Sequence, residues 1–211
     1  MKEKKLTHRA AWRAVPPGQP RTLRSWLTWR GSLTSRIVAC CGITATDTQT
    51  NGQTHSQTQT QTGFRLTRLM QRYRPGNIDE LAELGLRFKQ QALVREVILW
   101  NGDTPLVFAH SLAARRDLYG AWRALKGLGT RPLAAMLFAD ARIARLPIEF
   151  KKIDKRHPLY RRAHALCGAL PKALWARRSV FLLRGRRLLV TEVFLPGILL
   201  LPGDKARHDP D

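Results

Sequence analysis

Short runs of apolar and β-branched residues, separated by turn residues, fill the chain between residues 64 and 195. The run 92–100 contains two charges, Arg95 and Glu96, and is followed by Asn101-Gly102, a pair typical of tight β-hairpins. Hairpins join most of the expected strands, so the pattern predicts an antiparallel sheet. In all, the runs predict six strands, at 64–75, 92–100, 104–112, 147–153, 176–183 and 187–195.

Apolar residues at helical spacing predict four helical segments, at 21–37, 117–128, 133–138 and 159–166. Gly127 and Gly129 end the second segment, and Pro132 suits the first turn of the third. The expected fold class is therefore α+β, a six-stranded antiparallel sheet with helices packed around it.

The domain is expected to span residues 21–200 and to be flanked by flexible ends. Residues 1–20 are basic and interrupted by prolines, which predicts a flexible tail, and we expect the same of residues 201–211. Within the domain, the stretch 44–62 reads TATDTQTNGQTHSQTQTQT and has no large apolar side chain. It cannot bury enough surface to offset the entropy lost on ordering, so we expect a disordered insertion.

The chain is strongly basic, with 37 Lys and Arg against 15 Asp and Glu in 211 residues and a formal net charge of +22. Such a charge attracts polyanions, nucleic acid above all. However, the excess is mostly arginine spread along the chain, and we find no zinc finger, RNA-binding motif or basic region with heptads. The charge therefore favours anionic partners in general, small dicarboxylates included, and we expect no specific nucleic-acid partner.

Other features exclude further classes of protein. Apolar runs fall short of the ~18–20 residues that a membrane-spanning helix needs, so we expect no membrane insertion. The three cysteines, Cys40, Cys41 and Cys167, neither form a closed disulfide framework nor have the spacing of zinc ligands. We therefore expect a cytoplasmic protein without a metal site.

Two charged residues occupy positions where the strand pattern calls for apolar ones. Arg95 shares a strand face with Val97 and Leu99, and Glu192 lies in a strand whose two faces are both apolar. A buried charge costs several kcal/mol unless it is paired or lies in a wet cavity. Two interpretations follow: these residues line a ligand pocket, or Arg95 forms an internal ion pair with Glu192 or Glu96.

Five stretches together resemble the chorismate pyruvate-lyase family. The resemblance extends from about residue 21 to residue 196, apart from the insertion. Its most specific part is an Arg-Glu pair before an Asn-Gly hairpin, combined with a final Thr-Glu-x-Phe-Leu-Pro strand. The stretches are WLTWRGSLT at 26–34, VREVIL at 94–99, FAHS at 108–111, GTRPL at 129–133 and LVTEVFLP at 189–196.

The resemblance implies a cofactor-free cytoplasmic enzyme that converts chorismate into 4-hydroxybenzoate and pyruvate, the first step of ubiquinone biosynthesis. In the family, the pocket lies against a six-stranded antiparallel sheet and is closed by helical flaps. By position, Arg95 corresponds to the carboxylate-binding arginine and Glu192 to the glutamate near the ring hydroxyl. Leu33 and Leu133 match positions whose main chain reaches the ligand.

His110 departs from the family pattern, because the resemblance aligns it with an arginine. A protonated imidazole can bind the second carboxylate of chorismate, although it is shorter and titrates near neutrality. The alternative is a neutral, hydrogen-bonded histidine within the strand. We expect the substrate and its product to be the partners of a monomer.

Two other functions remain open from the sequence. The same fold occurs as a non-catalytic, small-ligand-binding effector domain of transcription regulators, but residues 1–63 are expected to be too short to form the DNA-binding domain of such proteins. A basic nucleic-acid-binding protein is the second alternative, and salt-dependent retention on DNA without chorismate turnover would favour it.

Overall fold

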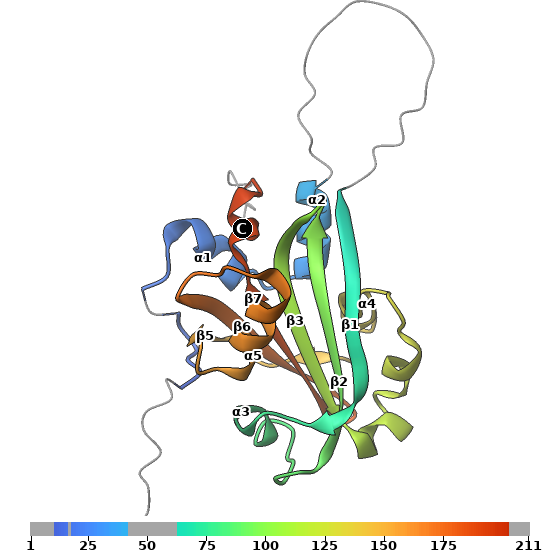
Figure 1. Ribbon diagram of the computed structural model, residues 1–211. Coiled ribbons are helices and arrows are strands. Elements are labelled where there is room, and N and C mark those ends of the chain that lie inside the picture. The colour runs from blue at the N-terminus through green and yellow to red at the C-terminus, as the bar shows by residue number, and fades with distance from the viewer. Residues whose placement is uncertain (1–10, 17, 42–62, 203–211) are drawn as a thin grey trace, which may run out of the picture.

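The computed structural model describes residues 11–16, 18–41 and 63–202 as an α+β fold around one antiparallel sheet (Figure 1). All six expected strands are present, and β4 is an additional strand of two residues that pairs with β6. The sheet order is β1-β2-β3-β7-β6-β4, and β5 also pairs with β6. The strands are β1 (Phe64–Pro75), β2 (Gln91–Asn101), β3 (Thr104–Ala114), β4 (Ala144–Arg145), β5 (Glu149–Asp154), β6 (Ala173–Leu183) and β7 (Arg186–Phe194).

Short helices surround the sheet. The α-helices are α1 (Arg21–Thr28), α2 (Leu33–Cys41), α3 (Ile78–Leu81), α4 (Leu133–Ala139) and α5 (Pro158–Cys167), and the 3-10 helices are η1 (Arg115–Tyr119), η2 (Arg123–Gly127) and η3 (Pro196–Leu200). The expected helices at 133–138 and 159–166 are confirmed as α4 and α5.

The other two expected helices are each broken in two. The segment 21–37 was expected to be one helix, but the chain leaves the helical conformation at Trp29 and begins again at Leu33. The buried Arg177 donates hydrogen bonds to carbonyl oxygens at the end of α1, which stabilises this early end. The segment 117–128 forms η1 and η2, because Gly120 between them is far from helical, with φ −130° and ψ −110°.

The sheet is buried on both faces, as the apolar strands require. On one face, α1 and α2 pack against Val97, Leu99 and Phe194, while α4, η1 and η2 pack against the far end of the same face. On the opposite face, α5 packs against Ile98 and Phe108 (Figure 1). Alternate residues of each strand therefore enter two separate interiors.

The hairpin between β2 and β3 contains an irregularity that determines which residues face which interior. Asn101 pairs with Thr104, so the turn residues are Gly102 and Asp103 rather than the expected Asn101-Gly102. Gly102 has φ +55°, as at the first central position of a tight hairpin turn. Between Leu99 and Trp100 the register shifts by one residue, so that Arg95 pairs with Ser111.

Part of the expected N-terminal tail contacts the domain. The Trp12 indole donates a hydrogen bond to Asp79 Oδ2 at 3.1 Å, and Arg13 forms an isolated antiparallel bridge with Phe150 of β5. These contacts differ from the flexible tail expected for the whole of 1–20. Likewise, Leu201 is buried at the start of the expected C-terminal tail. The insertion 44–62 and residues 1–10, 17 and 203–211 lie outside the described residues.

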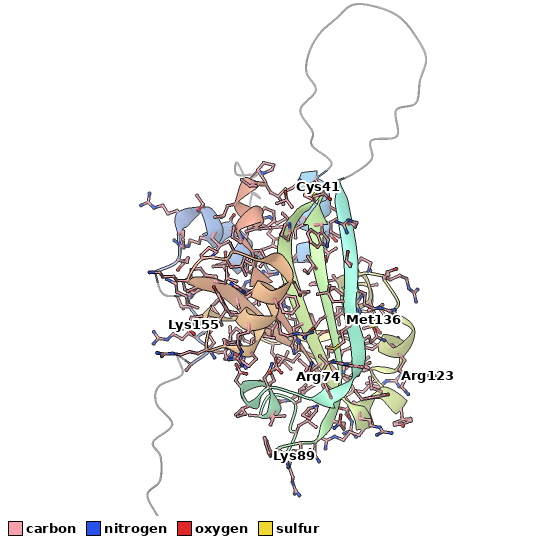
Figure 2. All side chains as sticks on the ribbon, in the orientation of Figure 1. Cys41, Arg74, Lys89, Arg123, Met136 and Lys155 are labelled. Carbon is pink, nitrogen blue, oxygen red and sulfur yellow. The ribbon has the colours of Figure 1, made fainter. Side chains whose placement is uncertain are left out.

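Much of the positive charge lies on the surface. Figure 2 shows long basic side chains such as Arg123 and Lys155 extending outward from the body of the molecule. The exceptions are the arginines that enter the two interiors, among them Arg95 and Arg177, which are 4% and 1% exposed. A buried guanidinium is costly unless it is paired or hydrogen-bonded. The contacts of these two arginines therefore define the candidate site.

Candidate active site

A cavity lies on the face of the sheet that α2 and α4 cover. The space inside it that the centre of a water molecule can occupy is about 50 Å³. On that measure one water needs ~10–15 Å³, so the cavity suits a small molecule and not a polymer. The strand residues that line it alternate along each strand, as residues of one face must. They are Arg95, Val97, Leu99, Ala109, Ser111, Arg177, Ser179, Phe181, Val190 and Glu192.

The rest of the lining comes from β1, β4 and the helical cover. It is mostly apolar, which lowers the local dielectric and strengthens polar contacts inside the cavity. These residues are Gly31, Leu33, Thr34, Leu66, Leu133, Ala134, Leu137, Phe138 and Arg145.

Arg95 enters this cavity from β2 as a buried cation. Its Nη2 donates to the carbonyl oxygens of Gly129 at 3.3 Å and Arg131 at 3.0 Å, in the segment before α4. Among the described residues, no carboxylate lies within 4.0 Å of its guanidinium. Burial and then the charge of nearby Arg68 lower its pKa to about 10, which leaves it protonated at neutral pH. A fixed cation of this kind, without a counter-ion, is suited to bind an anion.

Glu192 faces the cavity from β7 and is oriented by Arg177 of the neighbouring strand β6. Arg177 Nε donates to Glu192 Oε2 at 2.6 Å. The Nη1 of the same guanidinium donates to three carbonyl oxygens at the end of α1, those of Trp26, Leu27 and Trp29, at 3.1, 3.1 and 2.7 Å. One side chain therefore links the carboxylate in the cavity to the helical cover above it.

Arg145 lies at the Glu192 end of the cavity. Its Nε donates to Ser179 Oγ at 3.0 Å, and its Nη1 donates to the carbonyl oxygen of Arg30 at 2.5 Å. Burial and then the charge of Arg177 lower its pKa to about 10, against an opposing effect of Glu192.

The contacts decide between the two interpretations of Arg95 and Glu192. The ion-pair interpretation is wrong for both partners that it named, because Glu192 pairs with Arg177 and Glu96 pairs with His110 and Arg162. Arg95 and Glu192 instead face the same cavity without pairing with each other.

Leu33 and Leu133 also line the cavity, and each is the first residue of a helix, α2 and α4 respectively. The first N–H groups of a helix have no acceptor within the helix. Each helix that covers the cavity therefore begins at a residue that lines it.

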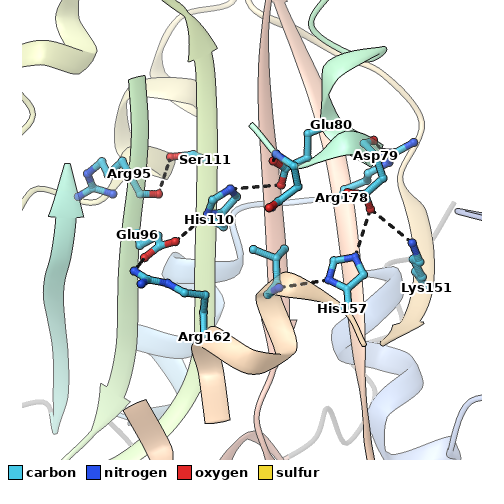
Figure 3. Close-up of polar contacts among 12 residues, drawn as sticks. Asp79, Glu80, Arg95, Glu96, His110, Ser111, Lys151, His157, Arg162 and Arg178 are labelled. Atoms are coloured by element: carbon cyan, nitrogen blue, oxygen red, sulfur yellow. Dashed lines mark hydrogen bonds and ion pairs between the residues drawn. The ribbon is translucent and has the colours of Figure 1, made fainter. Parts of the chain in front are cut away.

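The structure does not bring His110 to this cavity. Its neighbours in β3, Ala109 and Ser111, line the cavity, and the His110 side chain points to the opposite face. There it lies between two glutamates, with Nδ1 3.2 Å from Glu96 Oε1 and Nε2 3.2 Å from Glu80 Oε1 (Figure 3). The prediction that His110 contacts the second carboxylate of the substrate is therefore wrong, because the His110 side chain lies on the other face of the sheet.

Sequence reasoning missed Arg145 and Arg177. Arg177 carried a signal, because it is a charge inside an apolar strand, the same test that selected Arg95. Arg145 gave no such signal, since it belongs to a strand of two residues that has no readable periodicity.

A family model described as chorismate lyase matches residues 6–200 of the chain. The chain belongs to the chorismate lyase family. This confirms the resemblance drawn from the sequence. Within the family, a curated relative from Aromatoleum aromaticum is 45% identical over 199 residues, covering 92% of this chain and 97% of the relative. A second, from Nitrosospira multiformis, is 42% identical over 191 residues, covering 90% of this chain and 95% of the relative. Both are named probable chorismate pyruvate-lyase.

Solved structures give a looser likeness. A transcriptional regulator of the GntR family from Bacillus cereus matches with a TM-score of 0.48 and 10% identity, covering 68% of this chain and 98% of that one. A likeness at this level carries no argument about function.

In residues 11–16, 18–41 and 63–202, no group of three or more His, Cys, Asp or Glu side chains is placed to hold a metal ion. In the same part of the chain, every helix is too short or too polar to cross a bilayer.

Proposed function

We propose that this protein is a chorismate pyruvate-lyase, which releases pyruvate from chorismate and leaves 4-hydroxybenzoate. The family membership and the names of the relatives support this activity. We further propose that the product serves ubiquinone biosynthesis, and that the enzyme acts as a cytoplasmic monomer and needs no cofactor.

Each end of the product matches one end of the cavity. In the proposal, Arg95 binds the ring carboxylate, because a guanidinium fork holds a carboxylate through two parallel hydrogen bonds. Glu192 accepts a hydrogen bond from the ring hydroxyl, which is para to that carboxylate. The main-chain N–H groups of Leu33 and Leu133 complete the polar contacts, and the apolar lining packs against the ring.

The reaction balances without any oxidant, reductant or metal. The bond between C3 and the ether oxygen breaks, and the C4 hydrogen leaves as a proton, so the ring becomes aromatic. The departing enolpyruvate gains one proton at its methylene carbon and becomes pyruvate. Two routes for the proton fit the site: Glu192 takes it as a base, or it passes directly to the enolpyruvyl group while the protein only orients the substrate.

The observation that carries the proposal is that Arg95, a buried cation without a counter-ion, shares an enclosed apolar cavity with a carboxylate fixed by a different arginine. If Arg95 and Glu192 neutralised each other, neither group would be available to a ligand. Because Glu192 forms its ion pair with Arg177, Arg95 remains available to bind an anion.

The test is chorismate turnover by the purified protein, followed by 4-hydroxybenzoate absorbance and by a coupled assay for pyruvate. We expect Arg95→Lys to weaken 4-hydroxybenzoate binding roughly 10- to 100-fold, the range for one charge-assisted hydrogen bond. Glu192→Gln is expected to lower kcat and, because it leaves the buried Arg177 without its counter-ion, to lower the thermal midpoint as well. Arg72→Lys, an exposed change on β1, is the matched control and is expected to behave as wild type.

Three outcomes would contradict the proposal. Tight binding of 4-hydroxybenzoate without turnover would favour the non-catalytic binding module. Salt-dependent retention on DNA without turnover would favour a nucleic-acid-binding protein. Unstable Arg95 and Glu192 variants with normal residual specific activity would show that both residues are structural.

A further inference from the structure

Arg145 is the residue through which the enclosed cavity adjoins a second, larger groove. The groove measures about 630 Å³ and lies between the segment 14–16, helix α1 and the segment 146–150. Arg145 lines both spaces, whereas Arg95, Arg177 and Glu192 line only the inner one. The inner cavity and the outer groove therefore lie next to each other at Arg145.

The hydrogen bonds of Arg145 leave part of its guanidinium available. Nε is used by Ser179 and Nη1 by the carbonyl oxygen of Arg30, while Nη2 makes no hydrogen bond with any other described residue. No carboxylate in this part of the chain lies within 4.0 Å of Arg145, although Glu192 is near enough to influence it. Arg145 is thus a second cation without a direct counter-ion, at the opposite end of the cavity from Arg95.

The chemistry of chorismate places its second carboxylate at that end. The enolpyruvyl ether is attached at C3, next to the C4 hydroxyl and away from the ring carboxylate at C1. With the ring carboxylate on Arg95 and the hydroxyl on Glu192, the enolpyruvyl carboxylate must lie beside Glu192. The arginines at this end are Arg177, which already neutralises Glu192, and Arg145.

We propose that Arg145 binds the enolpyruvyl carboxylate of chorismate and thereby distinguishes the dianionic substrate from the product, which lacks that group. The inference rests on the proposed function and gives Arg145 the role that the sequence had suggested for His110. When the C3–O bond breaks, the contact with Arg145 passes to pyruvate, whereas 4-hydroxybenzoate keeps only its contacts with Arg95, Glu192 and the helix N–H groups.

The experiment compares substrate and product in the same variant. Because one charge-assisted hydrogen bond is lost, Arg145→Gln is expected to lower kcat/KM for chorismate roughly 10- to 100-fold, mainly through KM. The dissociation constant of 4-hydroxybenzoate is expected to stay within about 2-fold, which is little more than 0.4 kcal/mol. Arg145→Lys should recover part of the loss in KM, since the charge is kept. Arg24→Gln, an exposed arginine in the outer groove alone, is the control and should match wild type.

A pair of stable analogues makes the test independent of whether the variants fold. The wild-type protein is expected to bind 3-carboxymethoxy-4-hydroxybenzoate at least 10-fold more tightly than the methyl ester of that side chain. Arg145→Gln should remove the preference. Equal binding of the two analogues by the wild type would overturn the role of Arg145. A parallel loss of chorismate and 4-hydroxybenzoate affinity in Arg145→Gln would also overturn it, since that is the result of a purely structural residue. The proposed activity would survive both results, because it depends on whether the wild type converts chorismate.

Discussion

The burial of His110 on the face opposite the cavity predicts how the free energy of unfolding depends on pH. The side chain is 4% exposed and lies between Glu80 and Glu96, and Glu96 also pairs with Arg162 (Figure 3). Burial disfavours the charged imidazolium, but the charge of Glu80 and the hydrogen bond to Glu96 outweigh it. Together they raise the pKa of His110 to about 9. The perturbation is His110→Gln, which keeps a polar side chain there and removes the titration.

The sign follows from comparing the folded and unfolded states. Below the ordinary pKa of ~6.5, both states bind the proton, and the stabilisation by the two glutamates is fully present. Between pH 6.5 and 9 only the folded state binds it, so stability falls as pH rises, by about 1.4 kcal/mol per unit. Over the whole window the loss amounts to about 3 kcal/mol, and above pH 9 the contribution of His110 is gone.

The assay is urea unfolding of wild type and His110→Gln at intervals from pH 6 to pH 9.5. The free energy of unfolding of the wild type is expected to exceed that of the variant at pH 6, and the gap should close as pH rises to 9. His164→Gln, an exposed histidine on α5, is the control and should leave the pH dependence unchanged. A gap that stays constant across the range would refute the argument. Because His110 lies on the other face, the variant should bind 4-hydroxybenzoate as wild type does.

Two further predictions concern the cavity and the insertion. Arg177→Met leaves Glu192 without its ion-pair partner and removes the hydrogen bonds to the carbonyl oxygens at the end of α1, so it should lower the free energy of unfolding by about 3 kcal/mol. Adding Glu192→Gln should recover part of the lost free energy in the same urea assay. Replacing Thr44–Thr62 with a short Gly/Ser link should change the thermal midpoint little, because the entropic cost of closing a loop varies by only about 0.6 kcal/mol per halving of loop length. A large fall in the thermal midpoint, or loss of soluble protein, would show that the segment is structural.

Strand periodicity was enough to select Arg95 and Glu192 as charges in apolar strands, but it left open whether they line a pocket or form an internal ion pair. The partner of Glu192 could have been read from the last hairpin. Glu192 pairs with Arg177 because β6 and β7 form a hairpin, and the register that sets Leu183 opposite Arg186 also sets Arg177 opposite Glu192.

The position of His110 shows a second limit, set by a single residue. If the Asn101–Thr104 pairing continued without interruption, His110 would be the partner of Arg95 and would face the cavity with it. The irregularity between Leu99 and Trp100 inserts one extra residue in β3, so Ser111 becomes the partner. A shift of one residue reverses the face of every side chain beyond it, and its sequence sign is Pro105 beside the extra residue, because proline within a sheet is confined largely to edges, strand starts and bulges.

The position of β1 at one edge of the sheet has a consequence for how copies of the protein meet. An unpaired edge strand exposes main-chain donors and acceptors that can pair with another chain, which is a common start of aggregation. On β1, the side chains of Arg65, Arg68, Arg72 and Arg74 bring four positive charges along twelve residues. Two copies that met edge to edge would place these like charges against each other. Part of the large positive charge of this chain therefore has a use unrelated to any ligand: it keeps the longest open edge of the sheet from joining a second one.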